Sequence, residues 1–199
     1  ILADAVSTTI IRNNRFRCDR GWDIDLDDGT SNFHIYNNLC LNGGIKLREG
    51  FYRVVENNIM VNNSLHPHAW FSQSGDVFTR NIVMREYFPY QVEQWGRMVD
   101  YNIFADEHSL AKVREQGTDV HSIVVSLEFV NPSEGNYTLS DDSEAILKGS
   151  FQNFNMNHFG VVSAHLKAIA RTPRMSIPVS LMENKESRQV NWLGLSIKN

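Results

Sequence analysis

Short apolar stretches return along the first half of the chain, and each contains an asparagine. The asparagines, at spacings of 24, 20, 23 and 21 residues, are Asn14, Asn38, Asn58, Asn81 and Asn102. Three residues earlier the chain has Ile11, Ile35, Val55, Phe78 and Val99. One residue later it has Arg15, Leu39, Ile59, Ile82 and Ile103, and two residues later Phe16, Cys40, Met60, Val83 and Phe104. The pattern indicates five copies of one turn.

A period of this length with short β-rich segments is typical of a parallel β-solenoid, in which each turn packs only against its neighbours. The spaced leucines of leucine-rich repeats, which share the period, are absent. The asparagines are expected to stack at a bend, each amide bonding backbone groups and the next amide. The sequence therefore predicts an all-β fold, a right-handed parallel β-helix (solenoid) with short helices in its C-terminal part.

The repeats weaken after Asn102, and three regions are predicted. Residues 1–160 would form the C-terminal coils of the β-helix, including a short helix or Ω-like excursion in DEHSLAKVREQG and a short helix over Ala145 to Leu147 capped by Ser143. Residues 161–189 would form a short helix, capped by Ser163 and ending before Pro173, followed by a surface strap or linker. Residues 190–199 would begin a truncated following domain.

Composition narrows the function classes. The 199 residues are 42% hydrophobic, enough for a sizeable core, and carry a net charge of −4 with a pI near 6.0. This charge gives no reason to expect nucleic acid, and no apolar run approaches the roughly 20 residues of a membrane span. The start within an alternating segment suggests a piece of a longer polypeptide that could carry a targeting signal, and an extracytoplasmic location is favoured. Cys18 and Cys40 are expected to be buried thiols rather than a disulfide or metal pair.

The segments WDIDLDDG and GGIKLREG carry most of the unusual charge. Superposing Gly29 on Gly50 aligns Asp25 with Lys46, Asp27 with Arg48 and Asp28 with Glu49. Strand alternation then points Asp25, Asp27, Lys46 and Arg48 outward as pairs of opposite sign, and leaves Asp28 and Glu49 as an unneutralised pair at the strand ends.

Such a pair suits glycoside hydrolysis. Neighbouring strands lie about 4.8 Å apart, and retaining glycosidases hold two carboxyls about 5 to 5.5 Å apart. Two carboxylates so close cannot easily both ionise, so one pKa is expected to rise and that group to act as general acid, while Arg48 favours the charge on the other. The alternatives are a solvated charged face and a calcium site formed by Asp23, Asp25, Asp27 and Asp28, where Lys46 and Arg48 would compete with the cation.

The next turn adds imidazole and aromatic groups in HPHAW. His66, His68 and Trp70 could supply a stacking face and hydrogen bonds for a sugar ring. Each also has a structural interpretation, and the two histidines could form a zinc pair, although no third ligand is placed by spacing. Trp22 and Trp95 are further candidates for walls of the substrate site, and Asp76 and Glu93 could extend a cleft. Lys46 and Arg48 are also expected to contact the substrate.

The stretch GWDIDLDDGTSNFHIYNNLCLNGGIKLREGFYRVVENNIMVNNSLHPHAW resembles the active-site region of right-handed parallel β-helix glycoside hydrolases of the β-xylosidase type. The later FVNPSEGNYTLSDDSEAILKGSFQNFNMNHFGV resembles the closing segment of related bacterial β-helix proteins, some of which continue into a PDZ-like module. The first resemblance implies retaining hydrolysis with a glutamate acid/base, which falls on Glu49. It also implies an aspartate nucleophile, which falls on Asp25, Asp27 or Asp28.

The expected partner is an oligosaccharide or polysaccharide substrate, with no cofactor for the hydrolase. Two other functions stay open at this point. A polysaccharide lyase on the same fold would use the aspartates for calcium and Lys46 or Arg48 as the base that abstracts a proton from a uronic acid. A carbohydrate-binding or adhesive solenoid would have no catalytic group.

Overall fold

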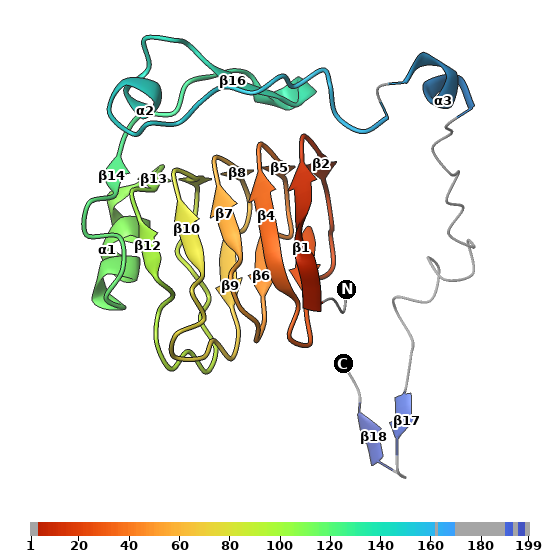
Figure 1. Cartoon of the computed structure of the whole chain (residues 1–199), viewed down its shortest axis with the longest axis vertical. Helices are drawn as coiled ribbons and strands as arrows, with labels where there is room; N and C mark the ends of the chain where they lie inside the picture. The colour runs from red at the N-terminus through yellow and green to blue at the C-terminus, as the bar shows by residue number, and fades with distance from the viewer. Residues whose placement is uncertain (1–3, 162, 170–189, 193–194, 198–199) are drawn as a thin grey trace. The chain divides into compact units, whose positions relative to one another are not determined.

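The computed structural model describes residues 4–161, 163–169, 190–192 and 195–197. Its first part is a parallel β-solenoid, as predicted (Figure 1). Sheet A is formed by β1 (Asp4–Arg12), β4 (Ser31–Tyr36), β7 (Val54–Glu56), β10 (Val77–Thr79) and β12 (Met98–Asp100). Sheet B is formed by β2 (Arg15–Phe16), β5 (Leu39–Cys40), β8 (Ile59–Met60), β11 (Ile82–Val83), β13 (Ile103–Phe104) and β14 (Ile123–Val124). Sheet C is formed by β3 (Ile24–Leu26), β6 (Ile45–Leu47) and β9 (Leu65–Pro67).

The asparagine ladder lies at the bend between sheets A and B, which confirms its prediction. Each Nδ2 donates to the Oδ1 of the asparagine one turn further on, at 3.1, 3.0, 3.0 and 3.2 Å from Asn14 to Asn102. The residue before each ladder asparagine has a positive φ of 53 to 58°, which turns the chain from one sheet to the next. Asparagine tolerates this left-handed conformation better than most residues, which accounts for the Asn-Asn pairs in the first three copies.

The apolar columns form two hydrophobic cores on opposite sides of sheet B. The residues three positions before and two positions after each ladder asparagine point into the solenoid. The column directly after it points outward, where Leu39, Ile59, Ile82 and Ile103 are fully buried in a second cluster. Adjacent strand residues face opposite sides, so two consecutive apolar columns require a cover outside the sheet. Both columns indicate the repeat in the sequence, but the repeat alone does not predict this second core.

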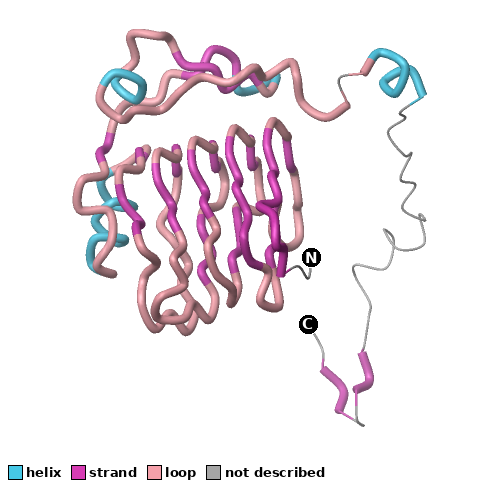
Figure 2. The backbone as a smooth tube through the Cα atoms, viewed as in Figure 1, coloured by secondary structure: helices cyan, strands magenta, loops and turns pink. Residues whose placement is uncertain are grey.

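Residues 125–159 provide that cover (Figure 2). They contain the antiparallel strands β15 (Phe129–Asn131) and β16 (Asn136–Leu139), the 3-10 helix η1 (Pro132–Glu134) and the helix α2 (Glu144–Leu147). Hydrogen bonds of 2.8 Å in both directions between the Asn57 side chain and the Gln152 backbone fasten the segment. Helix α2 follows Ser143 as predicted, but the predicted side-chain cap is wrong, because the Ser143 hydroxyl is buried without a hydrogen-bond partner.

Helix α1 (Glu107–Glu115) confirms the excursion predicted after Asn102, and the Asp106 side chain caps it by accepting from the Ser109 N–H at 2.8 Å. Cys40 is fully buried as expected, and burial raises the pKa of its thiol, whereas Cys18 is only half-buried. No helix among the described residues is long and apolar enough to cross a membrane.

The chain divides into two compact units, Ile1–Val162 and Ser163–Asn199. The second unit contains α3 (Ala164–Ile169), which begins directly after Ser163, and an antiparallel pair, β17 (Val190–Trp192) with β18 (Leu195–Ile197). The linker predicted for 174–189 lies outside the described residues. The strand pair lies within residues 190–199, the segment predicted to begin a following domain.

Candidate functional site

The register of sheet C is the one predicted from the two glycines. Ile24 pairs with Ile45, Asp25 with Lys46, and Leu26 with Leu47. The next pair of strands continues the columns, with Lys46 opposite His66 and Leu47 opposite Pro67. The leucines and isoleucines are buried inside the solenoid, so the column of Asp25, Lys46 and His66 lies on the outer face.

Lys46 faces outward as predicted but is only 5% exposed, so little of its side chain is available for the predicted contact with a substrate. Its Nζ lies 3.1 Å from Asp25 Oδ1 and 3.1 Å from Asp27 Oδ2. The indole of Trp22 lies over it, with the ring centroid 4.3 Å from Nζ. The ammonium is therefore held between two carboxylates and an aromatic face, which together compensate for its removal from water.

Arg48 bridges the carboxylates of two turns. Its Nη1 lies 3.1 Å from Asp27 Oδ1 and 3.3 Å from Asp28 Oδ1, and its Nε lies 2.7 Å from Glu49 Oε2. The contact with Glu49 is an ion pair by distance but is not aligned as a hydrogen bond. Glu49 Oε2 is shielded from solvent and accepts no hydrogen bond. The prediction that Asp28 and Glu49 form an unneutralised pair is wrong, since one guanidinium contacts both.

The charges around Asp27 favour its ionised form. Burial acts to raise the pKa of Asp27, but hydrogen bonds from Lys46 and Arg48 outweigh it, and the pKa lies below the usual value. The hydrogen bond to Asp27 and the charge of Glu49 raise the pKa of Arg48 in turn. Asp27 therefore stays a carboxylate to lower pH than an isolated aspartate.

Buried groups beneath sheet C hold the backbone that carries Arg48 and Glu49. Trp70 is fully buried, and its Nε1 donates to the Leu47 carbonyl at 2.8 Å. Arg53 and Asp76 form a fully buried ion pair, with Nε to Oδ1 at 2.9 Å and Nη2 to Oδ2 at 2.5 Å. The Nη1 of Arg53 donates to the Arg48 carbonyl.

The buried positions of Trp70 and Asp76 correct two predictions, and Arg53 is a further residue that supports the site. Trp70 was predicted to contact substrate and Asp76 to extend a cleft, but both lie in the interior. Arg53 was missed, because a single arginine among apolar neighbours gives no sign that it faces inward and pairs with a carboxylate one turn away. The interior of a solenoid turn excludes water, so such a charge needs a buried partner of opposite sign.

The two histidines sit around Trp22 and are uncharged at neutral pH. Their rings lie 5.9 Å (His66) and 5.8 Å (His68) from the indole in edge-on contact. Burial, with the nearby His68 and Lys46, lowers the pKa of His66 to about 4, and burial with Lys46 also lowers the pKa of His68. A neutral imidazole offers one donor and one acceptor, which suits a hydroxyl-rich ligand. His66 Nε2 already contacts Asn63 Oδ1 at 2.7 Å.

Asp23 does not belong to the outer acidic patch, which corrects its place in the calcium alternative. Its carboxylate accepts from the backbone N–H groups of Cys18 at 2.6 Å, Asn42 at 3.1 Å, Gly43 at 2.8 Å and Gly44 at 3.2 Å. Asp23 therefore fixes the turn before β6. Over the part of the chain that the structure describes, no group of three or more histidine, cysteine, aspartate or glutamate residues could hold a metal ion.

A hollow of about 430 Å³ lies at the bend after β9, lined by Ala69, Phe71, Gln91, Val92 and Glu93. Of these residues only Glu93 was predicted to belong to a cleft. Trp95, the other aromatic candidate, is partly buried; it packs edge-on against Trp70, and its Nε1 donates to the Gln116 carbonyl at 2.8 Å.

Four carboxylates, two cations, two neutral imidazoles and an indole thus gather on the outer face of sheet C. The arrangement offers an ionised aspartate, a half-buried glutamate on the next turn and groups able to bind hydroxyls. Carboxyl groups on adjacent turns are groups that can transfer protons or act as nucleophiles. Comparison of the chain with protein-family models, with curated proteins and with solved structures gives no match.

Proposed function

We propose that this chain carries the active site of a glycoside hydrolase that acts on a β-linked sugar such as a xylo-oligosaccharide with retention of configuration. The observation that supports this most is the sharing of Arg48 between Asp27 and Asp28 of one turn and Glu49 of the next. A planar guanidinium can contact both groups only if the carboxylates lie within its short span. Glycoside hydrolases act with a pair of carboxyls that flank the scissile bond at close range, and the retaining class takes the shorter separation of about 5 to 5.5 Å.

Glu49 is the proposed acid/base. It would protonate the glycosidic oxygen while an aspartate attacks the anomeric carbon, giving a covalent glycosyl ester and the free leaving alcohol. Glu49, now ionised, would then take a proton from water, whose oxygen attacks the same carbon and releases the aspartate. The first step requires that Glu49 carries a proton when the substrate binds.

The nucleophile is one of Asp25, Asp27 and Asp28. Asp27 has the environment best suited to an ionised nucleophile, because Lys46 and Arg48 both contact it and its pKa is lowered. Asp28 is the most exposed of the three, with a side chain 61% accessible. Lys46 would act by holding Asp25 and Asp27, and Trp22 with the neutral histidines would border the sugar.

A lyase is supported less well. Its base would be Lys46 or Arg48, and both already contact carboxylates. A lyase would give an unsaturated product that absorbs in the ultraviolet, and a chelator would abolish its activity.

The test is a panel of aryl β-glycosides, beginning with the xyloside, assayed with the full-length protein. Glu49→Gln should lower kcat by about 10² to 10⁴-fold, and one of Asp25→Asn, Asp27→Asn and Asp28→Asn should do the same. Glu56→Gln is the matched control, since Glu56 is also a half-buried glutamate paired with an arginine but lies on sheet A. Activity that survives Glu49→Gln and all three aspartate variants would exclude the proposed pair, and the anomer formed first would report retention.

A further inference from the structure

The hollow after β9 continues the column that carries Glu49. Glu49 lies two residues past Leu47, and Ala69 lies two residues past Pro67, the partner of Leu47 in the sheet. Ala69 therefore takes the place of Glu49 on the next turn, and its N–H donates to the Tyr90 carbonyl of the following turn at 2.8 Å. A methyl group at this position leaves the column open where the preceding turns carry carboxylates.

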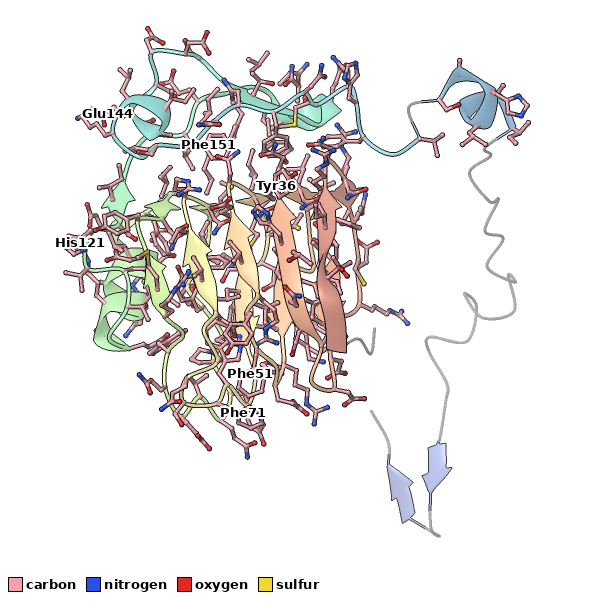
Figure 3. All side chains as sticks on the ribbon, viewed as in Figure 1. Tyr36, Phe51, Phe71, His121, Glu144 and Phe151 are labelled. Atoms are coloured by element: carbon pink, nitrogen blue, oxygen red, sulfur yellow. The ribbon has the colours of Figure 1, made fainter. Side chains whose placement is uncertain are left out.

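The lining combines an apolar wall with polar groups. Phe71 is 39% exposed, and its ring lies 5.8 Å from that of Phe51, the second residue after Glu49 (Figure 3). Gln91 offers an amide, and Glu93 Oε2 accepts from the Ser72 N–H at 3.4 Å and keeps further acceptor capacity. An aromatic face beside a few polar groups is the combination that binds a sugar ring.

We infer that this hollow is a second sugar-binding subsite, which holds one unit of a neutral oligosaccharide lying along the solenoid axis from Glu49 toward Phe71. The reacting unit at Glu49 rests on the proposed function, whereas the binding of sugar in the hollow does not. Glu93 is the one charged residue of the lining given above, and Glu49 lies one turn away. Both carboxylates would repel a uronic acid, which limits the substrate class to neutral sugars.

The experiment measures binding by titration calorimetry in the Glu49→Gln protein, with xylotriose, cellotriose and a trigalacturonide as probes. In this variant the carboxylate of Glu93 alone is left to repel the trigalacturonide. Phe71→Ala should weaken the binding of the neutral trisaccharide by about 10-fold, because the stacking face is lost. Ala69→Gln should weaken it similarly by filling the hollow. Glutamine suits this backbone, since Gln91 on the next turn has nearly the same φ, 52° against 50°. Tyr101→Ala removes an exposed aromatic ring on another bend and should leave binding unchanged.

The outcomes separate this inference from the proposed function. Unchanged neutral-sugar binding in both hollow variants, in protein with wild-type circular dichroism, would overturn the subsite even if Glu49→Gln abolishes hydrolysis. Binding lost in both variants while Glu49→Gln still hydrolyses the aryl glycosides would support the subsite and remove the proposed acid/base. Failure of both neutral trisaccharides to bind, or tighter binding of the trigalacturonide that Phe71→Ala weakens, would overturn the neutral subsite.

Discussion

The outer faces of sheets B and C belong to the same turns of the chain and differ in almost every respect. On sheet B the outward column is Leu39, Ile59, Ile82 and Ile103, fully buried under residues 125–159. On sheet C it is Asp25, Lys46 and His66, with Arg48 alongside at 43% side-chain exposure. The parallel backbone is common to both faces. The difference teaches that in a solenoid the residues of a single column decide whether a face becomes a core or a site.

The largest effect is expected beneath the site, where a buried ion pair can be compared with an exposed one. Arg53→Ala should lower the free energy of unfolding by about 3 to 5 kcal/mol, because Asp76 is left buried without its partner. Arg80→Ala breaks an arginine–glutamate pair between adjacent turns at the surface and should cost at most about 1 kcal/mol. Urea denaturation measures both, and equal costs would contradict the burial of the first pair.

A smaller effect is expected from the outer column of sheet B. Ile82→Ala should cost about 2 to 5 kcal/mol, because it leaves a cavity in the second core. Asp25→Ala, on the corresponding column of sheet C, should cost about 1 kcal/mol or less, since Asp27 still contacts Lys46. Thermal and urea denaturation of the pair would test the contrast, and a small loss for Ile82→Ala would show that residues 125–159 do not seal the face.

The pH dependence of stability should reflect the lowered pKa of His66 on sheet C. The pKa of His66 is about 4 in the folded chain and near 6.5 when unfolded, so protonation favours the unfolded state. This contribution is fully present above pH 6.5 and is lost as the pH falls toward 4. His66→Phe should therefore reduce the change in melting temperature between pH 6.5 and pH 4. An unchanged profile in the variant would mean that His66 is not desolvated.

The smallest predicted effect concerns a single carboxyl. Arg48→Met removes a hydrogen bond and a positive charge from Asp27, so the pKa of Asp27 should rise. The measurement is an NMR titration of the side-chain carboxyl carbon, with Arg80→Met as the control that leaves Asp27 unchanged. A pKa of Asp27 unmoved in Arg48→Met would show that Lys46 alone holds the charge.

The sequence was sufficient for the fold because the asparagine period repeats enough times to set the register. It also placed Asp25 opposite Lys46, since glycine positions and strand alternation depend on backbone geometry alone. It did not show that Lys46 is covered by Trp22 or that Trp70 lies inside, because rotamers and burial depend on neighbouring turns. Likewise, strand alternation does not specify that the long side chain of Arg48 reaches across columns and contacts carboxylates of two turns.

The asparagine ladder has a direction. Every amide points its N–H toward the next turn, so the side-chain dipoles add along the axis, and hydrogen bonds in such a row polarise one another. At Asn102 the row meets Asp119, whose carboxyl accepts from Nδ2 at 2.9 Å, and Ser122, whose hydroxyl accepts from the backbone N–H at 2.7 Å. A carboxyl at the positive end of the row acts as a terminator. A turn added beyond Asn102 would have to replace this stop, whereas a turn inserted before Asn102 would lengthen the row and leave the stop in place.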